Sequence, residues 1–163
     1  MPYRALEDRF VHDIGFEIRA GTLSELFAEA WTAVLSAMVD NPGSIREQQT
    51  ALLDLSHSEL DILLFDMLGE LIYRKDAEQS LYLAESVEVT DHRSESVEAG
   101  DQRKESRKVG DRRSGYTVRA SLYGERIDVQ RHTLMADVKA VTLDGLSVEQ
   151  HEGLYRATIT LDT

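Results

Sequence analysis

The chain of 163 residues contains no cysteine, has an apolar fraction of 42% and carries a formal net charge of −12. Its length suits one domain with its own core, and the missing cysteine excludes disulfides and cysteine-based zinc sites. The acidic balance repels phosphate backbones, which argues against a free-standing nucleic-acid binder. No apolar run approaches the roughly 18 residues that span a bilayer, and the start shows no signal peptide, so we expect a cytoplasmic protein with no membrane partner.

The N-terminal part of the sequence predicts a strand and then a helix. Residues 10–19 alternate apolar and polar side chains, which is typical of a half-buried strand, and Asp13 lies at or near its start. Thr22 and Glu25 then have the spacing of a capping box, which marks a helix N-terminus. Apolar residues follow at helical spacing until an Asn-Pro-Gly turn at 41–43 ends the helix.

A second helix is expected after another strand, which we place at residues 45–55. Ser56 and Glu59 have the spacing of a second capping box, which puts His57 in the first turn of this helix. A strong apolar stripe then continues to about Arg74. We interpret both apolar stripes as core rather than as cofactor-binding surfaces.

The C-terminal half predicts consecutive strands. Runs rich in β-branched and aromatic residues place them at 80–89, 116–123, 137–143, 146–151 and 155–161. Glu152 and Gly153 form a hairpin turn between the last two. Two early helices and several late strands indicate an α+β fold, in which two helices pack on a largely antiparallel β-sheet within a single domain, residues 1–163.

One segment, residues 91–115, differs from the rest because it repeats itself. It reads DHRSESVEAG, DQRKESRKVG and DRRSG, and it is almost free of large apolar groups. Such a segment cannot bury enough surface to offset the entropy of ordering, so we expect a flexible, repeat-containing loop insertion within the domain. A basic arm that contacts RNA is the alternative, but seven Lys/Arg against six Asp/Glu leave the segment close to neutral.

The segment 123–142, YGERIDVQRHTLMADVKAVT, carries the highest density of candidate functional residues. It reads as strand, loop and strand, and a stretch of nine residues within it contains Arg131, His132, Asp137 and Lys139. Charged side chains that a rigid sheet positions often carry function. The alternative is a solvated edge strand whose charges prevent pairing with another chain.

Motifs for nucleotide binding or nucleophilic catalysis are missing from the sequence, and the five histidines show no metal-ligand spacing. A site for a hard cation is more plausible, because such ions prefer several oxygen ligands. Asp13, Asp162 and the α-carboxylate of Thr163 would supply them if the strand at 10–19 meets the last strand. The alternative is a frayed C-terminus without a role.

Several of these sequence blocks together resemble the archease family. They are YGERIDVQRH followed by DVKAVT, the DIG at residues 13–15 and the final LDT. The resemblance covers nearly the whole chain. It implies an accessory protein rather than an enzyme: archeases activate an RtcB-type RNA ligase in tRNA splicing and RNA repair. They promote guanylylation of the ligase and its multiple turnover. The resemblance therefore implies that this protein contacts RNA only indirectly, through the ligase.

The resemblance also implies roles for individual residues. The family's metal site maps to Asp13, Asp162 and Thr163, with calcium as the expected divalent cation. Its other functional positions map to Arg131, Asp137 and Lys139, and His132 and Glu125 lie nearby in the sequence.

Two departures from the family pattern affect the fine detail of that site. Arg131 stands where lysine is frequent, and Asp137 replaces glutamate. A second role implied by the resemblance is that of a chaperone-like binding module for a tRNA methyltransferase or another RNA-modifying enzyme. The sequence leaves the number of subunits open.

Overall fold

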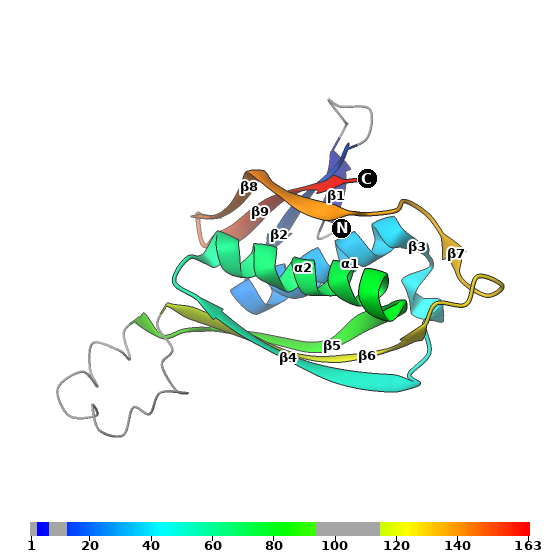
Figure 1. Cartoon of the computed structure of the whole chain (residues 1–163). Helices are drawn as coiled ribbons and strands as arrows, with labels where there is room; N and C mark the ends of the chain where they lie inside the picture. The colour runs from blue at the N-terminus through cyan, green and yellow to red at the C-terminus, as the bar shows by residue number, and fades with distance from the viewer. Residues whose placement is uncertain (1–2, 7–12, 94–114) are drawn as a thin grey trace, which may run out of the picture.

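The protein folds as two helices enclosed between two antiparallel sheets, as the computed structural model shows (Figure 1). The structure describes residues 3–6, 13–93 and 115–163. The helices are α1 (Leu23–Met38) and α2 (Leu60–Glu78), with a short 3-10 helix η1 (Pro42–Ser44). The strands are β1 (Tyr3–Leu6), β2 (Asp13–Ala20), β3 (Val39–Asp40), β4 (Gln49–His57), β5 (Ser80–Asp91), β6 (Tyr116–Arg126), β7 (Thr133–Leu134), β8 (Ala140–His151) and β9 (Leu154–Asp162).

The strands of the described part form two main sheets, one on each side of the helices. One has four strands in the order β1-β2-β9-β8, and the other has three in the order β4-β6-β5. A small pair, β3 with β7, joins the end of α1 to the connection between β6 and β8. Every pairing is antiparallel, so the predicted α+β class with two helices is confirmed, but the expected single sheet is divided into two.

Helix α1 lies between the two sheets, and half of its residues are buried. Its buried residues are Leu26, Phe27, Ala30, Trp31, Ala33, Val34, Leu35 and Met38. Trp31 also anchors the helix to the three-stranded sheet, because its indole Nε1–H donates to the Tyr82 carbonyl at 2.9 Å. One narrow stripe remains polar and partly exposed, because Glu25, Glu29, Thr32 and Ser36 recur at helical spacing.

The predicted cap of α1 is confirmed. Thr22 has extended backbone angles, and its hydroxyl accepts the Glu25 backbone N–H at 3.1 Å. We expect Thr22→Ala to lower the free energy of unfolding by about 1 kcal/mol, because a helix-terminal N–H then loses its partner. Thr22→Ser, which keeps the hydroxyl, should stay within about 0.5 kcal/mol of wild type in urea denaturation. Equal losses in both variants would contradict a capping role.

The predicted capping box of α2 is wrong. The helix begins at Leu60, its cap residue is Glu59, and no side chain makes a cap hydrogen bond there. Ser56 and His57 instead continue β4, where they pair with β6, so cross-strand hydrogen bonds prevail over the local motif. His57 therefore lies outside the helix, and its Nδ1 accepts the Glu59 backbone N–H at 2.9 Å.

The predicted strands of the C-terminal half are found with two changes. The predicted strands at 137–143 and 146–151 are not separate: residues 140–151 form one strand, β8, whose register shifts between Thr142 and Ser147, and residues 137–139 belong to the connection before it. The hairpin turn at Glu152 and Gly153 is confirmed, with φ angles of 54° and 81°. The predicted loop insertion connects the paired strands β5 and β6, and its residues 94–114 lie outside the described part of the chain.

The connection from β6 to β8, residues 127–139, is the part of the fold that positions the candidate site. It crosses from the three-stranded to the four-stranded sheet past the end of α1 (Figure 1). The backbone N–H groups of Met135 and Ala136 donate to the carbonyls of Met38 and Ala37, at 2.7 and 3.0 Å. Among the described residues, no helix has the length and apolar character needed to cross a membrane.

Candidate functional site

The predicted activation residues lie in two separate places along the connecting loop 127–139. Glu125, at the end of β6, meets Arg131 and His132 from the start of the loop. Asp137 and Lys139, at the end of the loop, lie instead beside α2 and β9. The structure therefore does not assemble the five residues into one cluster.

The buried cluster of Glu125, Arg131 and His132 holds the loop against the body of the protein. Only 3% of Glu125 is exposed, and Arg131 forms an ion pair with its carboxylate. Glu125 Oε2 also accepts from the Arg46 backbone N–H at 2.7 Å and lies 2.9 Å from His132 Nε2. The Arg131 guanidinium donates a further bond to the Ser44 carbonyl at 2.9 Å. A buried charge with this many partners is well compensated.

His132 makes a hydrogen bond with each of its ring nitrogens. The Asp128 backbone N–H donates to Nδ1 at 2.9 Å, so that nitrogen carries no proton. Nε2 then carries the ring proton and donates it to the Glu125 carboxylate. His132 therefore links the turn at Asp128 to Glu125, which makes it a positioning group.

Glu125 remains ionised over the whole physiological pH range. Burial opposes the charged form and would raise its pKa, but the hydrogen bonds from Arg131, the Arg46 backbone and His132 outweigh burial. Together they lower the pKa of Glu125 from 4.5 to about 2. The cluster is thus a permanent charge network, and its stability should depend on pH only in acid.

Asp137 and Lys75 form a second contact, between the loop and helix α2. Lys75 Nζ donates to Asp137 Oδ1 at 3.0 Å and also lies 2.7 Å from Asp76 Oδ1. Burial works against the charged amine, but both carboxylates outweigh it and raise the pKa of Lys75, and the same contact lowers the pKa of Asp137. The Asp137 carboxylate remains largely exposed, so it can still meet a partner.

Lys75 and Arg46 are functional candidates that sequence reasoning missed. Lys75 lies in the last turn of α2, where a basic residue is ordinary because it complements the helix dipole. Arg46 contributes a backbone N–H, which every residue except proline offers. Neither residue carried a signal in the sequence, because its role depends on contacts with residues more than 60 positions away.

Two of the predicted metal ligands, Asp13 and Asp162, lie opposite each other where the two central strands of the four-stranded sheet end. Asp13 on β2 pairs directly with Asp162 on β9, and Thr163 follows. On its other side, β9 meets β8, where the Lys139 backbone N–H donates to the Asp162 carbonyl at 2.8 Å. The condition set by the sequence, that the strand at 10–19 meets the last strand, is thus fulfilled. Among the described residues, no group of three or more His, Asp or Glu side chains is arranged for metal binding.

Comparison with known proteins shows which protein family this chain resembles. A model of the Archease protein family (MTH1598/TM1083) matches residues 3–163. The chain is 31% identical over 164 residues to the protein archease of Archaeoglobus fulgidus, with 99% of each chain covered. It is 24% identical over 151 residues to the protein archease of Pyrococcus abyssi, with 92% of each chain covered.

Two solved structures share the fold. The solution structure of Methanobacterium thermoautotrophicum protein 1598 is similar with a TM-score of 0.74 at 21% identity, over 99% of both chains. The crystal structure of a Thermotoga maritima archease, described as a possible chaperone, gives a TM-score of 0.59 at 14% identity over 97% of this chain and 96% of that chain. Since the family model spans nearly the whole sequence and the architecture agrees, the chain belongs to the archease family.

Proposed function

We infer that this protein is an accessory activator of an RtcB-type RNA ligase, acting in tRNA splicing or RNA repair by promoting guanylylation and multiple turnover of the ligase. The observation that supports this role best is that Asp13, Asp162 and Lys139 lie next to one another at one end of the four-stranded sheet. These residues come from the two ends of the sequence and the loop between them. They unite the positions that the family resemblance implies for metal binding and for activation.

The residues at this end of the sheet have the oxygen atoms that a hard divalent cation prefers. Asp13 and Asp162 are directly opposite each other on neighbouring strands, where two negative charges repel. A divalent cation such as calcium would relieve this repulsion, and oxygen atoms of Thr163 could complete the ligand set. When bound, the ion would supply positive charge for holding carboxylate or phosphate oxygens.

The remaining charged residues have two different roles in this proposal: some contact the partner and others position the loop. Asp137 and Lys139 are exposed, so they can contact the active site of the ligase directly. Glu125 and His132 are buried, so they position the loop. The protein itself performs no bond-making step; it would orient groups within the partner's metal- and nucleotide-dependent site.

A guanylylation assay with the cognate ligase tests the proposal. We expect wild-type protein to accelerate guanylylation, and Asp13→Asn or Asp162→Asn to remove most of the acceleration and weaken calcium binding at least tenfold in calorimetry. Asp144→Asn changes an exposed carboxylate of β8 that is not one of the candidate ligands, and this variant should behave as wild type. Unchanged guanylylation with a verified partner would refute the activator role.

A chaperone-like binding module, for a tRNA methyltransferase or another RNA-modifying enzyme, is the second candidate. The description of the Thermotoga maritima archease as a possible chaperone favours it. In that case the protein should suppress aggregation of its partner, and Asp162→Asn should not change the suppression. Light scattering of the heated methyltransferase, with and without the protein, separates this role from ligase activation.

A further inference from the structure

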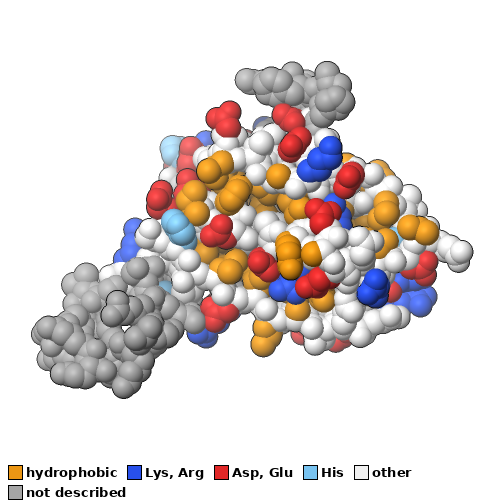
Figure 2. All heavy atoms as spheres, in the orientation of Figure 1, with side chains coloured by type: hydrophobic (Ala, Val, Ile, Leu, Met, Phe, Trp, Pro, Cys, Tyr) orange, Lys and Arg blue, Asp and Glu red, His pale blue; other side chains and the backbone are white. Residues whose placement is uncertain are grey.

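Exposed apolar side chains are frequent in the connecting loop 127–139. Seven large hydrophobic residues are exposed in the described part of the chain. Three of them, Val129 (75%), Leu134 (46%) and Met135 (58%), fall within this one loop. We call them the apolar tip. The loop projects from the end of the molecule beside β7 (Figure 1), where orange, red and blue side chains lie together (Figure 2).

The shape of the loop is fixed by its own hydrogen bonds. Asp128 organises a tight turn: its carboxylate accepts from the Gln130 backbone at 3.0 Å, and its carbonyl accepts from the backbones of Arg131 and His132. The buried ion pair with Glu125 ties this turn to β6. On the far side of the turn, β7 pairs with β3. The apolar tip is therefore held in place before any partner binds, which lowers the entropy cost of binding.

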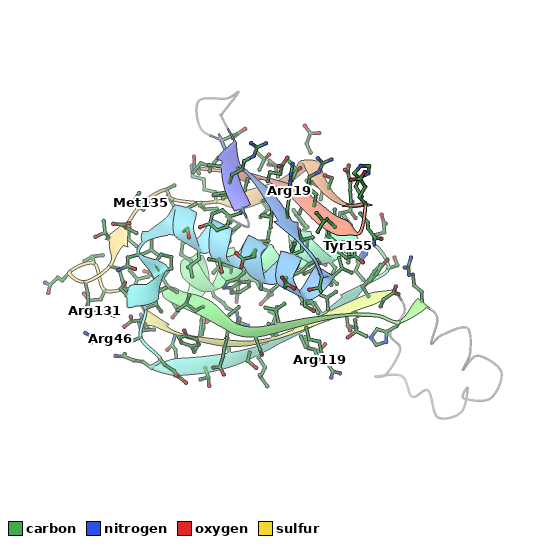
Figure 3. All side chains as sticks on the ribbon, turned by 180° about the vertical axis from the view of Figure 1, so that it is seen from behind. Arg19, Arg46, Arg119, Arg131, Met135 and Tyr155 are labelled. Atoms are coloured by element: carbon green, nitrogen blue, oxygen red, sulfur yellow. The ribbon has the colours of Figure 1, made fainter. Side chains whose placement is uncertain are left out.

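Two cations flank the apolar tip. Most of the described Lys and Arg side chains form an ion pair; Arg46, Arg126 and Lys139 do not, although Lys139 is close enough to Asp137 to help lower its pKa. Arg46 binds Glu125 through its backbone, so it lies next to the base of the loop, and Lys139 is the loop's last residue. Arg46, Arg131 and Met135 lie at the same end of the molecule (Figure 3). Cations without an ion pair are unusual in a chain of net charge −12, where carboxylates are abundant.

We propose that the apolar tip is the docking element of this protein, and that it inserts as a preformed plug into an apolar pocket with carboxylates at its rim on the RNA ligase. The assignment to the ligase rests on the proposed function. Burial of Val129, Leu134 and Met135 supplies the hydrophobic gain. Arg46 and Lys139 then meet carboxylates of the partner, which gives register and faster encounter.

The chemistry of the apolar tip favours a protein partner over nucleic acid. Single-stranded nucleic acid is held by aromatic side chains on which bases stack, and the apolar tip contains none. The Arg131 guanidinium is already engaged by Glu125 and Ser44, so it is not free to clamp a phosphate. Aliphatic side chains gain most from an apolar pocket, which protein surfaces offer and phosphate backbones do not.

Affinity for the purified ligase tests this docking element. The double variant Val129→Ser/Met135→Ser should raise Kd at least tenfold in calorimetry, because two exposed anchors are removed. Leu52→Ser is the matched control: Leu52 is 80% exposed on β4, and its removal should leave Kd within twofold. Arg46→Glu should weaken binding most at low salt, whereas Arg4→Glu on β1 should not. Equal unfolding midpoints of variants and wild type exclude misfolding.

The outcomes separate the docking element from the proposed function. If wild type binds and activates the ligase and the double variant does so equally well, the docking proposal is overturned while the activator role stands. If wild type does not bind the ligase at all, both proposals are overturned. If Arg46→Glu abolishes binding to RNA alone and leaves ligase affinity unchanged, the surface is a nucleic-acid contact and the docking proposal is wrong.

Discussion

Replacing Glu125 by glutamine should lower the free energy of unfolding by about 3 kcal/mol, because it breaks a buried charge cluster while leaving its partners in place. The carboxylate accepts from Arg131, His132 and the Arg46 backbone through two oxygens. Glutamine offers one oxygen, and its amide N–H groups would face another donor. Arg131 would also lose its counter-charge although three quarters of its side chain is buried.

Urea denaturation of the two proteins measures this cost, and Glu47→Gln provides the control. Glu47 is exposed and lies two residues before Gln49, close in sequence to the same corner of the fold. Its substitution should change the free energy of unfolding by less than about 0.5 kcal/mol. A similar small change for Glu125→Gln would mean that the buried cluster does not stabilise the fold.

The lowered pKa of Glu125 also predicts how the stability of the protein responds to acid. Its folded-state pKa of about 2 lies below the ordinary value of 4.5, so the folded protein binds a proton less readily than the unfolded chain. The stabilisation is therefore complete above about pH 4.5 and is lost as the pH falls towards 2. The stability difference between wild type and Glu125→Gln should shrink by about 3 kcal/mol across that window. A difference that is constant between pH 6 and pH 3 would contradict this account.

The sequence predicted the elements of this fold better than their arrangement. Helical spacing and the Thr22 cap located α1, because both are local signals. The division into two sheets depends on which strands pair, and pairing is decided by contacts distant in sequence. One signal was available: the polar residues of α1 form only a narrow stripe, and a helix with so wide an apolar surface is typical of a position between two layers. The false cap at Ser56 shows the opposite case, where strand pairing prevails over a local motif.

For the candidate site, too, the sequence predicted the local features but not the contacts between distant residues. The sequence pattern placed Asp13 at the start of a strand, and the pairing of β2 with β9 brings it to Asp162. Burial could not be foreseen: Glu125 and His132 lie in a segment rich in charge, which indicates solvent exposure, yet both are buried. Their burial follows from the loop folding back onto β6, and that fold depends on Arg131 reaching across to the Ser44 carbonyl. The likeness to the archease family supplied the residues, and only the structure separates positioning residues from exposed ones.

The largest expected loss of stability comes from Gly124→Ala, next to the buried cluster in the central strand β6. A Cβ at Gly124 would lie 1.8 Å from the Leu81 carbonyl oxygen and 2.9 Å from the Tyr82 Cα. These are backbone atoms of the neighbouring strand, so no side chain can rotate away to make room. Either β5 must move from β6 or the pairing must bulge, and we expect a cost of at least about 4 kcal/mol in urea denaturation.

Gly69→Ala is the matched control, because it adds the same methyl group where space is free. Gly69 is an exposed residue inside α2, and a Cβ there meets no atom within 4 Å. Alanine favours the helix over glycine, so this variant should gain about 0.5–1 kcal/mol. The two substitutions should therefore change stability in opposite directions. A loss of less than about 1 kcal/mol for Gly124→Ala would show that β5 yields readily, and that the close approach of the two strands does not fix the position of Glu125.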